Sequence, residues 1–154
     1  MIALDLRALA SLISDFVAKF DDTYTADFAD EFSSEPFDGC VYWSLLYCEG
    51  HAAYFYDDFC KRFPVAADFS YFTLALLHEI GHCETVDEME DDVEKRNSIR
   101  SMRQYVKLKN ERLATDWAGW WLTNNIEAAH DFDNKVTKLL KEFYIKHLDK
   151  MPVS

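Results

Sequence analysis

The feature that most constrains the fold is a group of polar residues set in an apolar run. In "TLALLHEIGHCET", residues 73–85, His78, Glu79 and His82 follow a full turn of apolar side chains. Such a run is expected to cross the centre of a domain, where histidine and glutamate side chains need polar partners. The fold must therefore bring such partners, or a metal ion, to this segment.

The spacing of His78 and His82 favours a metal ion. Residues four apart in a helix lie on one face, one turn apart, so the two imidazoles can bind the same ion. Zinc accepts neutral imidazole ligands, and a glutamate that does not bind the metal, here Glu79, can accept a proton from the metal-bound water. The alternative is a metal-free histidine pair that caps the helix or hydrogen bonds within it.

The third ligand is expected in "NERLATDWAGWWL", residues 110–122. This stretch has a helical pattern in which Glu111, Ala114 and Ala118 share one face. The alanines would let two helices approach closely, and a glutamate beside them on an apolar face needs a partner. Zinc would serve as that partner, so Glu111 is the expected third ligand.

Two other acidic residues compete with Glu111 for this role. Asp116 lies on the same predicted helix, and Glu88 follows the histidine pair by a few residues. We rank both below Glu111. A further alternative is that Glu111 pairs with Lys107 or Arg112 on the outside of its helix.

Together, these motifs resemble the gluzincin arrangement of zinc peptidases, and most of all the small ImmA/IrrE-like metallopeptidases. The resemblance covers residues 70–122, about a third of the chain. It rests on His-Glu-Ile-Gly-His at residues 78–82 and on the form Glu-x-x-Ala-x-x-aromatic-Ala, which begins 29 residues after His82. In this sequence the second form is Glu111, Ala114, Trp117 and Ala118.

The resemblance implies a single zincin-like metallopeptidase domain over residues 1–154, of α+β class. Such a domain is mostly helical, with the His-Glu-x-x-His helix against a small antiparallel sheet whose edge strand can align an extended substrate. It also implies a zinc ion held by His78, His82 and Glu111. In larger gluzincins an aspartate four residues after the ligand glutamate supports the first histidine, and here that position is Thr115.

The expected function is hydrolysis of a peptide bond by a zinc metallopeptidase. Zinc would lower the pKa of its bound water, Glu79 would take the proton, and the resulting hydroxide would attack the peptide carbonyl. Family members of this size often act on one regulatory protein, so we expect a protein or peptide substrate. Tyr105, His130 and His51 are the candidate donors to the oxyanion.

Sequence patterns also predict the order of the elements. Residues 4–20 read as an amphipathic helix, and an acidic, turn-prone stretch follows to Gly39. Residues 40–59 are rich in aromatic side chains and are predicted as a two-stranded hairpin, although a helix can show the same pattern. The later predicted helices are 68–84, with Asp68 or Ser70 as N-cap, about 95–126, and 132–149.

The composition agrees with one helix-rich, soluble domain. The chain has 154 residues, of which 49% are hydrophobic, with only four glycines and three prolines. Its net charge of −12 argues against direct binding to nucleic acid. No apolar run is long enough to cross a bilayer, and the N-terminal stretch lacks the marks of a signal peptide. We therefore expect a cytoplasmic protein without a membrane partner.

The four cysteines are expected to be reduced. They form no Cys-x-x-Cys pair, and a domain of this size does not need disulfides. A structural zinc site made of Cys40, Cys48, His51 and Cys60 is a weaker alternative, because its gaps match no common ligand spacing.

Two other function classes stay open. One is a non-catalytic zinc-bound protein whose acidic surface binds and inhibits a partner, although such a site has no need of Glu79. The other is a metal-free acidic protein, such as a mimic of nucleic acid, that blocks a basic groove. The acidic run 84–94 is expected to be a solvated connection balanced by the basic run 95–112. No pattern predicts the oligomeric state.

Overall fold

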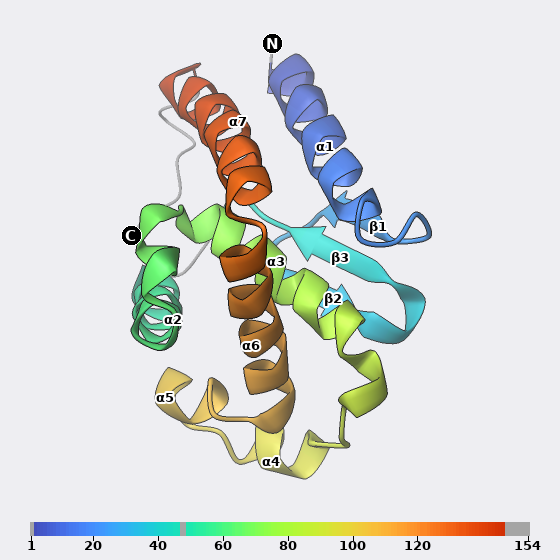
Figure 1. Ribbon diagram of the computed structural model, residues 1–154, viewed down its shortest axis with the longest axis vertical. Coiled ribbons are helices and arrows are strands. Elements are labelled where there is room, and N and C mark those ends of the chain that lie inside the picture. The colour runs from blue at the N-terminus through green and yellow to red at the C-terminus, as the bar shows by residue number, and fades with distance from the viewer. Residues whose placement is uncertain (1, 47–48, 147–154) are drawn as a thin grey trace.

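The computed structural model describes residues 2–46 and 49–146 (Figure 1). It is mostly helical with one small sheet, so the α+β class expected from the sequence is confirmed. The strands are β1 (Thr25–Phe28), β2 (Ser33–Glu35) and β3 (Cys40–Trp43). The α-helices are α1 (Ile2–Ala18), α2 (Glu49–Arg62), α3 (Tyr71–Glu84), α4 (Val93–Asn97), α5 (Met102–Tyr105), α6 (Lys109–Asn124) and α7 (Ile126–Lys146). Short 3-10 helices are η1 (Pro36–Asp38), η2 (Pro64–Asp68) and η3 (Val86–Glu88).

The sheet is mixed, with the strand order β1-β3-β2. β3 pairs in parallel with β1 and antiparallel with β2, so the expectation of a purely antiparallel sheet is wrong. The reason lies in the tight connection between β2 and β3. This connection ends at Gly39, whose φ of 66° is rarely adopted by other residues. It makes β2 the antiparallel neighbour of β3, and β1 takes the remaining edge.

β1 and β2 lie in the stretch that the sequence marked as acidic and turn-prone and in which no strand was predicted. Both are edge strands of three or four residues, and their side chains are exposed or half-buried. They therefore lack the alternation of apolar and polar residues that marks a strand in a sequence. β3, with buried Val41 and Trp43, carries that alternation and was predicted.

α2 replaces the second strand of the predicted hairpin. Ala52, Phe55 and Phe59 recur at helical spacing, and Ala52 and Phe59 are buried in the core. The exposed Tyr54 and the half-buried Tyr56 lie between them and hide that period in the sequence. The spacing of the buried residues thus identifies this segment as a helix, whereas its apolar content alone was compatible with a strand or a helix.

The predicted helix of residues 95–126 is divided into α4, α5 and α6. Ser101 begins α5, because its hydroxyl accepts a hydrogen bond from the backbone N–H of Gln104, so the chain restarts a helix there. A second break at Asn125 separates α6 from α7, which begins at Ile126, six residues earlier than predicted. The end of the predicted helix 132–149 lies outside the described residues.

α3 runs through the centre of the molecule, and all its residues from Phe72 to Cys83 are buried. Its predicted N-cap, Ser70, is confirmed, because the Ser70 hydroxyl accepts from the backbone N–H of Thr73 at 3.2 Å. The sheet contacts α3, and α6 packs directly along it (Figure 1).

The approach of α3 to α6 depends on Gly81. A Cβ atom at this position would lie 2.4 Å from the carbonyl oxygen of Ala114 in α6, which is closer than any real contact. The absence of a side chain at Gly81 therefore lets the two backbones touch. The helices approach closely, as expected, but this contact depends on Gly81 of α3, which the sequence pattern did not single out for this role.

α1 and α7 lie side by side at one end of the molecule (Figure 1). α1 confirms the first predicted helix, and it buries Leu9, Ile13, Phe16 and Val17. Phe16 stacks on Phe132 of α7 with ring centroids 3.9 Å apart. None of the helices within the described residues has the length and apolar character needed to span a membrane.

Candidate metal centre

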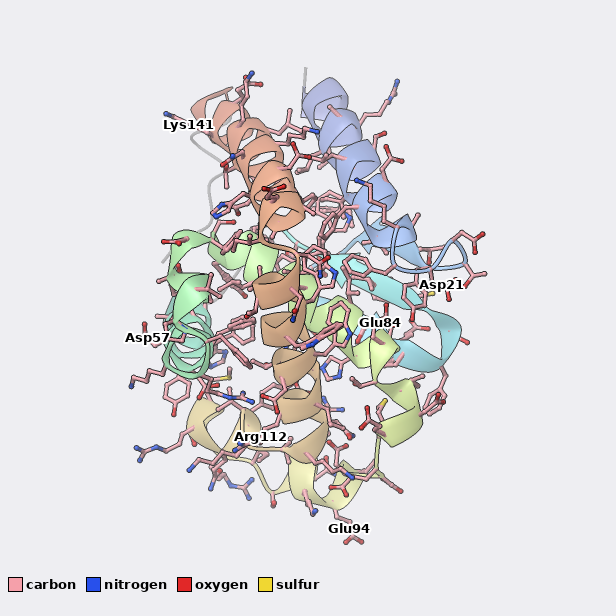
Figure 2. The ribbon with its side chains drawn as sticks, viewed as in Figure 1. Asp21, Asp57, Glu84, Glu94, Arg112 and Lys141 are labelled. Carbon is pink, nitrogen blue, oxygen red and sulfur yellow. The ribbon has the colours of Figure 1, made fainter. Side chains whose placement is uncertain are left out.

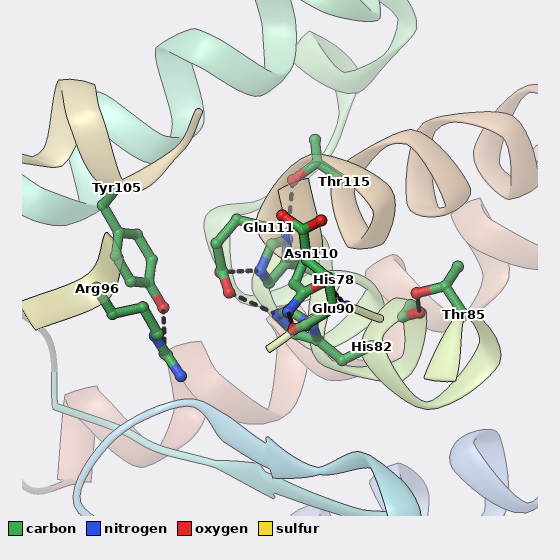
Figure 3. Close-up of polar contacts among 10 residues, drawn as sticks. His78, His82, Thr85, Glu90, Arg96, Tyr105, Asn110, Glu111 and Thr115 are labelled. Carbon is green, nitrogen blue, oxygen red and sulfur yellow. Dashed lines mark hydrogen bonds and ion pairs between the residues drawn. The ribbon is translucent and has the colours of Figure 1, made fainter. Parts of the chain in front are cut away.

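Two neighbouring helices bring His78, His82 and Glu111 together (Figure 3). The histidines lie one turn apart on α3, and Glu111 comes from the first turn of α6. Their exposed fractions are only 5%, 7% and 5%, respectively. The arrangement predicted from sequence spacing, with both histidines and this glutamate at one point, is present in the structure.

The donor atoms of these three residues face one another. Glu111 Oε1 lies 3.0 Å from His78 Nε2, and Glu111 Oε2 lies 3.2 Å from His82 Nε2. All three donor atoms fit within 4.8 Å of one another. Two ligands of a tetrahedral zinc ion, each about 2.0–2.1 Å from the metal, are separated by roughly 3.3–3.4 Å. The group could therefore hold a metal ion with little movement.

Charge couples the three side chains. Burial by itself raises the pKa of Glu111, but hydrogen bonds from His78 and His82 and their charge outweigh it, so this pKa lies well below its ordinary value. Burial lowers the pKa of His82, and the Glu111 carboxylate more than offsets it, so that pKa is raised. In the metal-free centre, hydrogen bonds from the histidine nitrogens to the Glu111 carboxylate link the three side chains. A bound metal ion would take the place of the protons in these hydrogen bonds.

Thr115 orients His78. The Thr115 hydroxyl lies 2.8 Å from His78 Nδ1 and is buried one turn after Glu111 on α6. With Nδ1 engaged in this way, Nε2 is the nitrogen turned towards Glu111. His78 is thus contacted by a neutral hydroxyl and not by a carboxylate at this nitrogen.

The alternatives to Glu111 do not reach the centre. Asp116 is exposed on the far side of α6 and pairs with Arg62. Glu88 is exposed in η3. Arg112, labelled in Figure 2, is also exposed, whereas Glu111 is buried against the histidines. The alternative of an outward ion pair between Glu111 and Arg112 or Lys107 is therefore wrong.

Glu79 lies beside the centre without joining the group of possible ligands. It is 9% exposed and lines the cavities on both sides of the centre. Burial raises the pKa of Glu79, because the charges of His78 and His82 and a hydrogen bond from Ser34 only partly oppose it. A carboxylate with a raised pKa is a stronger base than an exposed one.

The two cavities give the centre access to solvent. One has a volume of about 350 Å³ and lies towards β2 and the segment 89–96. The other has a volume of about 390 Å³ and lies towards α2. Glu31, Phe32, Glu79, Tyr105 and Glu111 line both, so the centre lies where the two meet.

Of the three candidate oxyanion donors, Tyr105 lines both cavities, His51 lines only the cavity towards α2, and His130 lines neither. The Tyr105 hydroxyl accepts a hydrogen bond from Arg96 Nη2 at 3.5 Å (Figure 3). Burial, together with the charges of Glu111 and Glu79, raises the pKa of Tyr105 above its ordinary value, so the phenol keeps its proton. His51 is exposed at the edge of one cavity, and His130 stacks on Phe69 at 4.4 Å.

Asn110 ties the loop before α4 to the metal centre. Its side-chain amide donates to the carbonyl of Glu90 at 2.8 Å and accepts from the Glu90 backbone N–H at 3.0 Å. The Glu90 carboxylate pairs with Lys95 and Lys109, as expected if the basic run balances the acidic one. Asn110 directly precedes Glu111 in the chain, so the start of α6 positions both the loop before α4 and the Glu111 carboxylate.

The proposed cysteine site gains no support. Cys40 lies in β3 and Cys60 in α2, and both are free thiols, while Cys48 lies outside the described residues. Within residues 2–46 and 49–146, His78, His82 and Glu111 form the group that could hold a metal.

Comparison with models of known protein families, with curated proteins and with solved structures finds no match to this chain. The chemistry of the centre is therefore inferred from its own residues. Sequence spacing predicted that His78, His82 and Glu111 meet, with Glu79 beside them. The resemblance placed Thr115 at an orienting position without predicting its contact with His78, and nothing in the sequence pointed to Arg96, which contacts Tyr105.

Proposed function

We propose that this chain is a zinc metallopeptidase with a zincin-like fold of the gluzincin type. His78, His82 and Glu111 are its zinc ligands, and Glu79 is its general base. The observation that carries the proposal is the meeting of these three buried donors at a point where two open cavities join, with Glu79 beside them.

The donor set suits zinc. Two imidazole nitrogens and one carboxylate are a common set of protein ligands in catalytic zinc sites, which keep the fourth position for water or substrate. The contact between Thr115 and His78 Nδ1 supplies the orienting partner that metal-binding histidines usually have. A hard cation such as magnesium would favour more oxygen ligands than this group offers.

When bound, zinc supplies a Lewis acid that polarises the peptide carbonyl and acidifies a water molecule. The Glu79 carboxylate accepts a proton from that water and returns it to the nitrogen of the leaving amine. The Tyr105 hydroxyl, which keeps its proton, donates to the oxygen of the attacked carbonyl, and Arg96 holds the phenol in place.

The sheet supports a peptide as the substrate. β2 is an edge strand, and Ser33 and Ser34 line the cavity beside the metal centre. An extended peptide can add to such an edge through backbone hydrogen bonds. We propose a segment of one regulatory protein as the natural substrate. We place the reaction in the cytoplasm, where the free thiols of Cys40, Cys60 and Cys83 stay reduced.

Metal content tests the ligand set. Elemental mass spectrometry of the purified protein should find about one zinc per chain. His78→Ala should lose the zinc, Glu111→Ala should bind it weakly, and Glu79→Gln should keep it. His130→Ala is the matched control, because this histidine stacks on Phe69 away from the centre, and it should keep the metal. A native protein that takes up no zinc after refolding with the metal contradicts the proposal.

Peptide cleavage separates an enzyme from a non-catalytic zinc protein. The zinc-loaded protein should cut peptides within a complex mixture, and Glu79→Gln, with its zinc retained, should lose at least about 100-fold in rate because the general base is gone. If Glu79→Gln and the native protein bind zinc equally and cut equally, Glu79 has no catalytic role.

A further inference from the structure

Basic residues are concentrated in one part of this acidic chain. Seven of the 16 lysines and arginines lie between residues 95 and 112, in a chain whose net charge is −12. The one acid in this segment, Glu111, is buried against the histidines, so it does not neutralise the surface. Figure 2 shows nitrogen-tipped side chains gathered where α4, α5 and the start of α6 meet. Like charges repel one another, so a bound anion would relieve an electrostatic cost of this arrangement.

A cavity of about 470 Å³ lies among these basic residues, and we call it the basic cavity. The cations that line it are Lys95, Lys107, Lys109 and Arg112. Leu108 and Leu113, which are buried and half-buried, supply apolar surface between the charges. Two acids, Glu90 and Asp116, also line the cavity, but Asp116 pairs with Arg62 outside it. The basic cavity is thus separate from the two cavities that open on the metal centre.

Two of the four cations already hold a carboxylate of the chain itself. Glu90 Oε1 lies 3.2 Å from Lys95 Nζ, and Glu90 Oε2 lies 3.8 Å from Lys109 Nζ. In the part of the chain that the structure describes, Lys107 and Arg112 are exposed and have no ion-pair partner. Glu90 therefore shows that a carboxylate fits between these cations, and two further cations are left to bind carboxylates of another molecule.

The size and surroundings of the basic cavity favour a short acidic protein segment as its occupant. Clusters of basic side chains recognise acidic motifs, and the two leucines can contact an apolar side chain among the acids. A long polyanion such as nucleic acid would also meet the rest of a surface with a net charge of −12, which repels it. The cavity towards β2 is bordered by Glu31, Asp91 and Asp92, so it disfavours acidic side chains.

We infer that the basic cavity is a docking site for an acidic segment of the protein substrate, with several Asp or Glu residues next to an apolar side chain. The inference rests on the proposed peptidase function and adds a means of substrate selection to it. Glu90 lines both the basic cavity and the cavity towards β2, so the two adjoin at this residue. A substrate held by its acidic segment can extend its neighbouring residues to the metal centre, where their effective concentration is raised.

Binding of a model peptide tests the docking site without an identified substrate. The probe is Asp-Glu-Leu-Asp-Glu-Leu with blocked ends, and the matched neutral peptide is Asn-Gln-Leu-Asn-Gln-Leu. Calorimetry at low salt should show the zinc-loaded protein binding the acidic peptide at least about tenfold more tightly than the neutral one. Added salt should weaken this binding, because it screens exposed charges. Inorganic phosphate and a short oligothymidylate are the probes for other anions.

A double variant, Lys107→Glu with Arg112→Glu, tests the cavity itself. It should bind the acidic peptide at least about tenfold more weakly than the native protein and keep its zinc, because both side chains are exposed and unpaired in the described chain. The matched control is Lys138→Glu with Lys141→Glu in α7. It makes the same change in net charge at exposed positions that do not line the basic cavity, and it should keep the native affinity within about twofold.

Cleavage tests the link to the substrate. When the acidic peptide is joined to a peptide that the protein cuts, KM should fall while kcat stays unchanged. The Lys107→Glu, Arg112→Glu variant should show no such fall in KM, and the α7 control should show it in full. Equal KM values with and without the acidic segment would contradict a role in substrate selection.

Zinc content, measured on each sample, separates the docking site from the proposed function. A protein that binds the acidic peptide but takes up no zinc contradicts the proposed function, and its peptide binding still supports an acidic-segment site. A zinc-loaded protein that binds the two peptides equally, or loses affinity equally in both double variants, contradicts the docking site alone. Tighter binding of phosphate or oligothymidylate than of the acidic peptide contradicts an acidic protein segment as the occupant.

Discussion

At the scale of single residues, the precision of the centre depends on Thr115. Its hydroxyl contacts His78 Nδ1 at 2.8 Å and directs the other nitrogen towards Glu111. A hydroxyl carries no charge, so it orients the imidazole without the added basicity that a carboxylate gives to a metal-binding histidine. Thr115 therefore acts mainly by orienting the His78 ring.

Thr115→Val should weaken zinc binding by about 10- to 100-fold, because it keeps the shape of the side chain and removes its hydrogen bond. Thr115→Ser should stay close to the native protein. Competition against a coloured chelator measures these affinities. Thr123→Val is the control on the same helix, since the Thr123 hydroxyl bonds only to the carbonyl of Gly119. Equal zinc affinity in Thr115→Val and the native protein would show that His78 needs no such partner.

The sequence predicted those residues of the centre that can be recognised from their own helix, by their spacing or by the apolar residues around them. His78 and His82 are one helical turn apart, and Glu111 stands out as an acid on an apolar face. Only the resemblance drew attention to Thr115, without predicting a contact from its hydroxyl, and Arg96 carries no such signal. Their partners depend on how α6 is rotated against α3 and on how the chain folds back between them, which only the packed structure defines.

At the scale of elements, the backbones of α3 and α6 touch each other directly at Gly81. The Cβ position of this residue is occupied by the backbone of Ala114. An added methyl group must push the helices apart, and the donors of α3 and α6 would move with them. Gly81 therefore sets the distance between the histidines and Glu111.

Gly81→Ala should lower the free energy of unfolding by about 1–3 kcal/mol and weaken zinc binding as well. Gly50→Ala in α2 is the matched control, because nothing lies within 4 Å of its Cβ position. This change should raise stability by up to about 1 kcal/mol, since alanine favours a helix more than glycine does. Urea unfolding of the metal-free proteins measures both changes. A Gly81→Ala variant as stable as Gly50→Ala would show that the two helices can separate at no cost.

The elements that the sequence missed are those stabilised by their surroundings. β1 and β2 are short strands paired to β3, and their own residues carry no strand pattern. α2 is a helix because one side of it meets the core at Ala52 and Phe59. The central helix α3 and the amphipathic helix α1 were predicted, because their own residues show the pattern. α3 is apolar over most of its length, and α1 has apolar residues at helical spacing.

At the scale of the whole molecule, the proposed zinc ion would compete with protons for one buried centre. The lowered pKa of Glu111 contributes stability above the ordinary glutamate value of 4.5, and this contribution is lost as the pH falls. The raised pKa of His82 contributes stability below the ordinary histidine value of 6.5, and this is lost as the pH rises through the folded pKa. The metal-free centre is thus most stabilising in the mildly acidic range between these values.

Zinc requires unprotonated histidines, so its stabilising effect should increase with pH. We expect a saturating amount of zinc to raise the Tm more at about pH 8 than at about pH 6. Removal of zinc by a chelator should lower the Tm at the higher pH but leave a folded, helical protein, because the hydrophobic core around α3 does not depend on the metal. Thermal melts followed by circular dichroism, with and without zinc, give both results. An equal rise at the two pH values would contradict competition with protons.

The contact between Gly81 and Ala114 also has an evolutionary consequence. The two halves of the centre are held by helix packing, and the 24 residues from 85 to 108, which connect α3 to α6 and carry Tyr105 and Arg96, contribute none of the three possible metal donors. Natural selection can therefore lengthen, shorten or replace much of this connection while the donor atoms keep their positions. A lineage descended from the same ancestor would preserve the paired helices and diverge first in the segment between them.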